Sequence, residues 1–143
     1  MDEFTQDYLV QEVESADPAK LVELLYQRAL RDLMNARELW SMLDKDPASI
    51  RLLVHAQCIV MELQKSLNYE QGGEVALNLS RLYDFIQFSI VEITRDRTPD
   101  DAKKIEDLIE ILSSISDAWS TMARQQRESQ SVRSLSSNEI LVA

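Results

Sequence analysis

Hydrophobic side chains recur at steps of three and four residues along most of the chain, and this spacing predicts four long helices. Each of the three prolines follows a residue that can cap a helix and therefore marks a helix start: Asp17-Pro18, Asp46-Pro47 and Thr98-Pro99. Gly72 and Gly73, the only glycines, are adjacent and predict the turn between the second and third helices. The expected helices span residues 18–43, 47–70, 74–96 and 99–125.

Short connections between long helices force neighbouring helices to run antiparallel. We therefore expect an all-α fold, an antiparallel up-and-down four-helix bundle that forms one domain over residues 1–125. A short N-terminal segment with a weak helical pattern, from Phe4 to Val13, precedes the bundle. Residues 126–143 are rich in Ser, Gln and Arg and have too little apolar surface to offset their ordering entropy, so a disordered polar tail is expected there.

The apolar arcs of the predicted helices are wider than one bundle seam requires. The arc of the first helix includes Leu21, Val22, Leu25 and Tyr26, and on the second helix Met61 lies to one side of the inward stripe. The third helix has an inward stripe that includes Val75, Leu82 and Tyr83, while Leu77, Phe88 and Val91 fall among polar residues. The last helix shows a narrow seam, which ends in Trp119 and Met122. The surplus on the first two helices predicts grooves for a partner.

Composition narrows the class of partner. The chain has 143 residues, of which 45% are hydrophobic and 28% charged, and its net charge is −10. This acidity argues against a nucleic-acid or anionic-membrane partner, because phosphate binding depends on Lys and Arg. Neither a signal peptide nor an apolar run long enough for membrane insertion is recognisable, so we expect a cytoplasmic protein. The single cysteine, Cys58, is expected to be a small buried hydrophobe.

Residues for catalysis are not recognisable. A di-metal site in a bundle needs two Glu-x-x-His motifs, but the chain has one histidine, His55, which is expected to face solvent or to be hydrogen-bonded. Gly72-Gly73 is followed by Glu74 and so does not form a phosphate-binding loop. We therefore predict a binding protein that is not an enzyme, with no catalytic residue, no cofactor and no metal site.

Four motifs occur in order along the chain. Tyr8 precedes an Ala-Asp-Pro cap by about ten residues, and a leucine-rich run ends in an aromatic residue at Tyr26. The central run is Gln71-Gly72-Gly73-Glu74-Val75-Ala76, followed by Asn78-Leu79 and Leu82-Tyr83-Asp84-Phe85, and Asp117-Ala118-Trp119 lies near the end of the last helix. These motifs resemble the FliS family of flagellin export chaperones, and the central run is the most similar part. The resemblance covers roughly residues 6–120, with departures at Asp17, where Ser is usual, and at Gln27-Arg28 in place of Asp-Gly.

The resemblance implies a cytosolic export chaperone that binds the C-terminal segment of flagellin and prevents its premature polymerisation. It also implies a second partner, a component of the flagellar type III export gate, to which the client is delivered. The alternative is a helical-bundle adaptor or regulatory protein that binds another amphipathic segment.

The candidate client-binding residues are aliphatic and aromatic side chains on the expected surplus surface. They are Tyr8, Leu9, Leu21, Val22, Leu25, Tyr26, Met61, Tyr83 and Phe88. Tyr26 and Tyr83 suit either the core boundary or client contact, and Phe88 is either a contact or an isolated exposed aromatic. Phe4, Tyr8 and Leu9 either cover apolar grooves until the client displaces them or simply close one end of the core.

Overall fold

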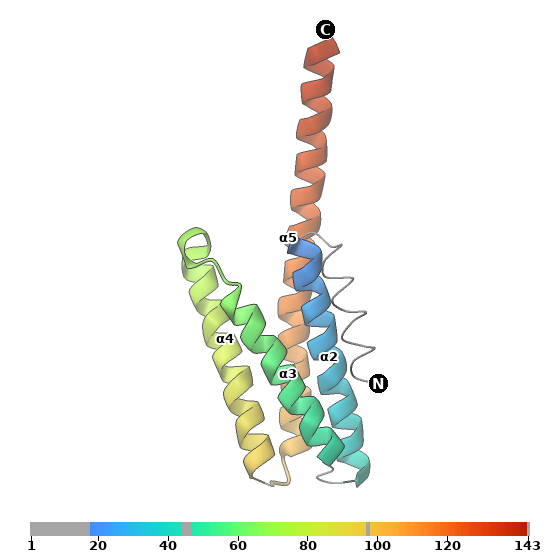
Figure 1. The fold of residues 1–143 in the computed structure, drawn as a ribbon, viewed down its shortest axis with the longest axis vertical. Coiled ribbons are helices and arrows are strands. Elements are labelled where there is room, and N and C mark those ends of the chain that lie inside the picture. The colour runs from blue at the N-terminus through green and yellow to red at the C-terminus, as the bar shows by residue number, and fades with distance from the viewer. Residues whose placement is uncertain (1–17, 44–46, 97, 143) are drawn as a thin grey trace.

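The computed structural model describes residues 18–43, 47–96 and 98–142. Four helices make up the described chain: α2 (Pro18–Leu43), α3 (Pro47–Lys65), α4 (Tyr69–Arg95) and α5 (Asp101–Val142). They run alternately down and up, so the antiparallel up-and-down four-helix bundle is confirmed (Figure 1). The expected N-terminal segment, with Tyr8 and Leu9, lies outside the described residues.

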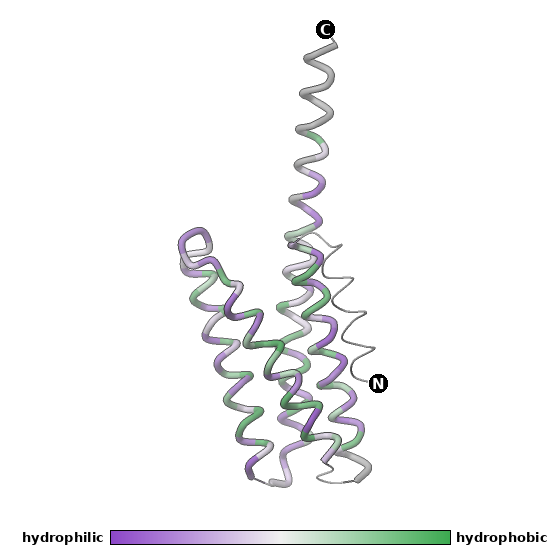
Figure 2. The backbone as a smooth tube through the Cα atoms, in the orientation of Figure 1, coloured by the Kyte–Doolittle hydropathy of each residue, from purple (hydrophilic) through white to green (hydrophobic). Residues whose placement is uncertain are grey.

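The helices are amphipathic, as the spacing of apolar residues predicts, and Figure 2 shows hydrophobic and hydrophilic residues alternating along them. The largest fully buried side chains come from all four helices and form one core. They include Tyr26 and Leu33 of α2, Leu53 and Leu63 of α3, Ile86 and Ile90 of α4, and Leu108 and Leu112 of α5.

Helix α2 is packed on two sides. It makes its most extensive contacts with α3 and the next most extensive with α5, whereas α4 packs mainly on α3 and touches α5 little. Polar contacts tie α2 to α5 near both ends: Arg37 Nη1 lies 3.2 Å from Glu106 Oε1, and Ser120 Oγ donates to Glu23 Oε1 at 3.3 Å. Helix α4 is therefore an edge helix, and in Figure 1 its upper end leans away from α5 together with α3.

The break between α3 and α4 falls earlier than the glycines. Helix α3 ends at Lys65, and Asn68 caps α4 by accepting a hydrogen bond from the Gln71 backbone N–H at 3.1 Å. The prediction that the second helix continues to residue 70 is therefore wrong. The break predicted at the glycines is present, but it separates the first turn of α4 from the rest of that helix. Gly73 has φ 50° and ψ −124° at this kink, a backbone conformation that residues with a Cβ rarely adopt.

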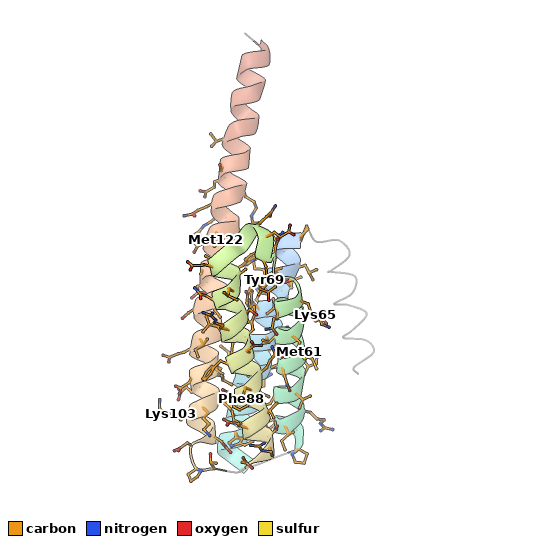
Figure 3. The ribbon with its side chains drawn as sticks, turned by 90° about the vertical axis from the view of Figure 1, so that its left-hand side faces the viewer. Met61, Lys65, Tyr69, Phe88, Lys103 and Met122 are labelled. Atoms are coloured by element: carbon orange, nitrogen blue, oxygen red, sulfur yellow. The ribbon has the colours of Figure 1, made fainter. Side chains whose placement is uncertain are left out.

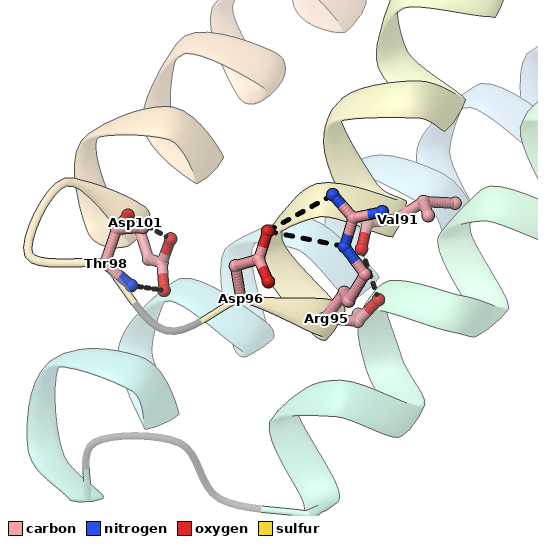
Figure 4. Close-up of polar contacts among 6 residues, drawn as sticks. Val91, Arg95, Asp96, Thr98 and Asp101 are labelled. Atoms are coloured by element: carbon pink, nitrogen blue, oxygen red, sulfur yellow. Dashed lines mark hydrogen bonds and ion pairs between the residues drawn. The ribbon is translucent and has the colours of Figure 1, made fainter.

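Two hydrogen bonds between Thr98 and Asp101 cap the start of α5. The Thr98 backbone N–H donates to Asp101 Oδ2 at 3.2 Å, which is the reach-back bond of a capping box, and the Thr98 hydroxyl donates to Asp101 Oδ1 at 2.8 Å (Figure 4). The cap at Thr98-Pro99 was predicted, although α5 begins at Asp101 and not at Pro99. On the α4 side of the same connection, Arg95 binds the Asp96 carboxylate at 3.2 Å (Figure 4).

Helix α5 continues beyond the bundle to Val142 and projects from it (Figure 1). The sequence predicted disorder over residues 126–143, because this segment lacks apolar surface to bury. Extending an existing helix avoids the nucleation cost, and the Gln, Arg and Glu residues near its start are good helix formers, so local helix formation does not need a packed face. The division into a 1–125 domain and a tail stays a prediction.

Candidate functional site

Six large apolar side chains face outward on α4. They are Val75, Leu77, Leu82, Phe85, Phe88 and Val91, with exposed fractions of 39–64%. We call this set the α4 outer face. The opposite side of the same helix is also apolar, because Ala76, Tyr83, Ile86, Ile90 and Ile93 are buried in the core. Single exposed hydrophobic residues are common, so the unusual feature is the number of large apolar side chains that this one helix exposes between polar residues such as Arg81 and Glu92.

The α4 outer face has two flanks, because successive residues turn by about 100° around a helix. Leu77, Phe88 and Val91 lie beside the residues that bind α3, and Val75, Leu82 and Phe85 lie on the other side. Seen from the α4 side, Figure 3 places Phe88 of α4 on the same face of the molecule as Met61 of α3 and Met122 of α5. Met61 and Met122 thus add exposed apolar side chains on the two other helices seen in this view.

A polar network holds α4 against α3. Gln64 Nε2 lies within hydrogen-bond distance of three acceptors on α4: Ser80 O at 3.2 Å, Ser80 Oγ at 3.1 Å and Asp84 Oδ1 at 2.7 Å. Gln87 Nε2 donates to Gln64 Oε1 at 2.8 Å, and the Tyr69 hydroxyl donates to Ser80 Oγ at 3.0 Å. These directional contacts fix the orientation of α4 on α3 and thereby keep its outer face turned toward solvent.

Tyr26 and Tyr83 join α2 and α4 inside the core. Their hydroxyl groups form a hydrogen bond, and their exposed fractions are 2% and 1%. Burial raises the pKa of both hydroxyls above the ordinary tyrosine value of 10.0; the hydrogen bond partly offsets this for Tyr26 and adds to it for Tyr83. Both tyrosines therefore occupy the core, one of the two placements that the sequence left open, and a bound segment could contact them only if the bundle opened.

The other candidate contact residues on the described helices are partly exposed. Leu21, Val22 and Leu25 are half-buried on α2, and Val22 and Leu25 pack against the core. Met61 is 40% exposed and Phe88 is 64% exposed. The predicted outward position of Phe88 is therefore correct. Client contact by any of these residues stays a prediction.

Four residues expected inside the protein lie outside. Val75, Leu82 and Met122 were assigned to inward stripes, but their exposed fractions are 62%, 39% and 52%. Their helices α4 and α5 make few contacts with each other, so the positions between them are not closed. Cys58 is exposed, not buried. It lies one helical turn from Val54 and Met61, which are also exposed, and therefore faces away from the core.

The most buried charged contact links α2 to α3. Asp32 is 1% exposed; His55 Nδ1 contacts its Oδ2, and Arg28 Nε lies 3.7 Å from its Oδ1. His55 is thus partly exposed and hydrogen-bonded, as predicted. Across the described helices, the structure has no cluster of three or more His, Cys, Asp or Glu residues that could hold a metal ion. Within the same residues, no helix is long and apolar enough to cross a membrane.

The fold and the α4 outer face define a class: a helical bundle whose edge helix presents an apolar surface for another protein chain. Comparison with known proteins identifies the family within this class. A family model described as flagellar protein FliS matches residues 1–126. The chain therefore belongs to the FliS family, which confirms the resemblance found in its sequence motifs.

Three relatives illustrate the similarity. The flagellar secretion chaperone FliS of Salmonella typhimurium is 35% identical over 107 residues, which cover 75% of this chain and 77% of that protein. The flagellar secretion chaperone FliS of Vibrio cholerae is 31% identical over 108 residues, 76% of each chain. The flagellar secretion chaperone FliSB of Pseudomonas aeruginosa is 29% identical over 119 residues, 83% of this chain and 91% of that protein.

Proposed function

We propose that this protein is a flagellar export chaperone, which binds the C-terminal segment of flagellin on the α4 outer face. The observation that carries the proposal is the presence of six exposed apolar side chains on the two flanks of α4, whose inner side is buried in the core. Membership of the FliS family and the names of its relatives, flagellar secretion chaperones, support the choice of client.

An amphipathic client segment would cover this face with its own apolar side. Each Leu or Ile of the client that becomes fully buried contributes about 1.5–3 kcal/mol, so a few such residues suffice for binding. A client that is unfolded beforehand loses conformational entropy when it binds, which keeps the affinity moderate and allows release. Met61 and Met122, whose side chains adapt to irregular partners, extend the contact on either side of α4.

This mode of binding gives the protein its role in export. A flagellin whose C-terminal segment is covered cannot use that segment to polymerise, so the chaperone delays assembly in the cytoplasm. Delivery to a component of the flagellar type III export gate then requires only that the client be transferred, since the bound segment remains without a compact fold of its own. Leu21, Val22 and Leu25 on α2 remain candidates for further contacts.

Calorimetric titration with a flagellin C-terminal peptide tests the proposal. We expect saturable binding to the whole chain and none with a peptide of scrambled sequence. Phe88→Ser should weaken binding at least about tenfold, because burial of one aromatic side chain is lost. Met34→Ser is the matched control, since Met34 is 46% exposed but lies on α2. Absence of binding at tens of micromolar would contradict the proposal. Equal losses of peptide affinity in Phe88→Ser and Met34→Ser would contradict the assignment of the site to α4.

A further inference from the structure

Trp119 carries a polar atom for which the structure offers no partner. Its indole ring packs against the core from α5, and Nε1 is buried without a hydrogen-bond partner among the described residues. An indole N–H can only donate a hydrogen bond, and nearly all buried donors in native proteins are paired. An unpaired donor at this position therefore calls for a functional explanation.

Trp119 lies near the end of the part of α5 that packs in the bundle. Ile115, one turn earlier, is buried, whereas Met122, nearly one turn later, is 52% exposed and lies on the face that carries α4 (Figure 3). The neighbouring residue Ser120 is already engaged with Glu23 of α2. The Trp119 N–H is thus a buried donor on the inner side of α5, between Ile115 and Ala123, which are also buried.

We propose that Trp119 Nε1 donates a hydrogen bond to a main-chain carbonyl of the bound client. This inference rests on the proposed function and assigns one polar anchor to an otherwise apolar binding surface. A client segment brings such acceptors with it, because the last carbonyls of a helix and those of extended chain have no partner within the segment. Because α4 makes few contacts with α5, little packing between these two helices has to be broken for a client carbonyl to reach the buried N–H.

An anchor of this kind suits a chaperone. A main-chain carbonyl is present at every residue, so the contact fixes the position of the client without demanding one particular side chain. The client would supply a partner for this donor in the complex, whereas no group of the described residues pairs with it in the free protein. A Trp that served packing alone would not distinguish the free protein from the complex in this way.

Indole ¹H–¹⁵N spectra of the whole chain, labelled at its two tryptophans, test the inference. Saturation with a flagellin C-terminal peptide should move the Trp119 indole proton downfield and slow its exchange with water. Trp40, which is buried in the core, is the internal reference and should stay in place. A Trp119 resonance that remains unchanged while the peptide binds would overturn the inference and leave the proposed function intact. Absence of peptide binding would contradict both.

Affinity provides a second readout. Trp119→Phe removes the donor and should weaken peptide binding roughly three- to tenfold, whereas the Trp40→Phe control should not. Phe is also smaller than Trp, so the sharper comparison uses a tryptophan analogue with sulfur in place of the ring N–H, incorporated in the Trp40→Phe background. Unchanged affinity with this analogue would contradict the hydrogen bond, even if Trp119→Phe fails to fold.

Discussion

Helices α2 and α4 both carry wide apolar arcs, but the bundle covers one and leaves the other open. On α2 the core residues are at most 7% exposed; they are Tyr26, Ala29, Leu33, Ala36 and Trp40. Among the described side chains of α2, Met34 is the one large hydrophobic residue that is exposed. On α4 the six residues of the α4 outer face remain exposed, as does Tyr69. Helix α2 lies between α3 and α5, whereas α4 packs mainly on α3. The place of a helix in the bundle, and not its pattern alone, decides which apolar surface is available for binding.

The largest expected effect is on the free energy of unfolding, and it distinguishes two adjacent residues of α4, one on its buried side and one on its exposed side. Ile90 is fully buried, and Ile90→Ala should lower the free energy of unfolding by about 2–5 kcal/mol through lost burial and a cavity. Val91 is 41% exposed, and Val91→Ala should change the free energy of unfolding by less than about 0.5 kcal/mol. Urea unfolding of both variants measures the difference. Similar losses would mean that Val91 is covered in the free protein.

The kink that starts α4 is expected to have the next largest effect. Gly73 has φ 50°, and a Cβ there would meet no neighbouring atom within 4 Å, so an Ala substitution introduces backbone strain without a clash. Gly73→Ala should lower the free energy of unfolding by about 1–3 kcal/mol. Glu74→Ala, at an exposed neighbouring position, is the control and should have little effect. A Gly73→Ala variant as stable as the wild type would indicate that the kink is not required.

The tyrosine pair tests how α4 is attached to α2. Tyr83→Phe leaves the buried Tyr26 hydroxyl without its partner and should lower the free energy of unfolding by about 1–2 kcal/mol. The double variant Tyr26→Phe/Tyr83→Phe removes both polar groups and should be closer to the wild type than the single variant is. A double-mutant cycle from urea unfolding gives the coupling. Additive losses would contradict a direct interaction.

The same tyrosine pair also predicts that the free energy of unfolding depends on pH, an effect smaller than those above. Because burial raises the pKa of both hydroxyls, the unfolded chain loses these protons near the ordinary value of 10.0 while the folded protein keeps them. The free energy of unfolding should therefore fall as pH rises above about 10, and this contribution should be constant below it. Urea unfolding across that range should show a steeper fall for the wild type than for Tyr26→Phe/Tyr83→Phe. Equal slopes would contradict the prediction.

Much of the fold was predictable from local signals. Proline marked the starts of α2 and α3, and the Thr98-Pro99 cap lies just before the start of α5. The glycine pair was only partly informative, because Gly73 breaks the start of α4 and does not end α3. Asn68, with Gln71 three residues later, is a helix-cap signal that would have placed the α3–α4 break correctly.

Exposure on α4 and α5 was harder to predict. Helical spacing places Val75, Leu82 and Met122 with the inward residues, and their exposure follows from the orientation of α4 relative to α5. That orientation depends on contacts between segments far apart in the sequence, such as Gln64 with Ser80 and Asp84. Phe88 was recognisable because it lies among polar residues on its own helix. The unpaired N–H of Trp119 has no sequence signal, because its burial is set by packing.

Hydroxyl-radical footprinting of the whole chain, with and without a flagellin C-terminal peptide, tests the central claim most directly. It compares side-chain protection at Phe85 and Phe88 on α4 with that at Met34 on α2, all of which are exposed in the free protein. We predict that the peptide lowers the modification rate of Phe85 and Phe88 and leaves that of Met34 unchanged. Protection of α2 with no change at Phe85 and Phe88 would contradict the assignment of the binding surface to α4.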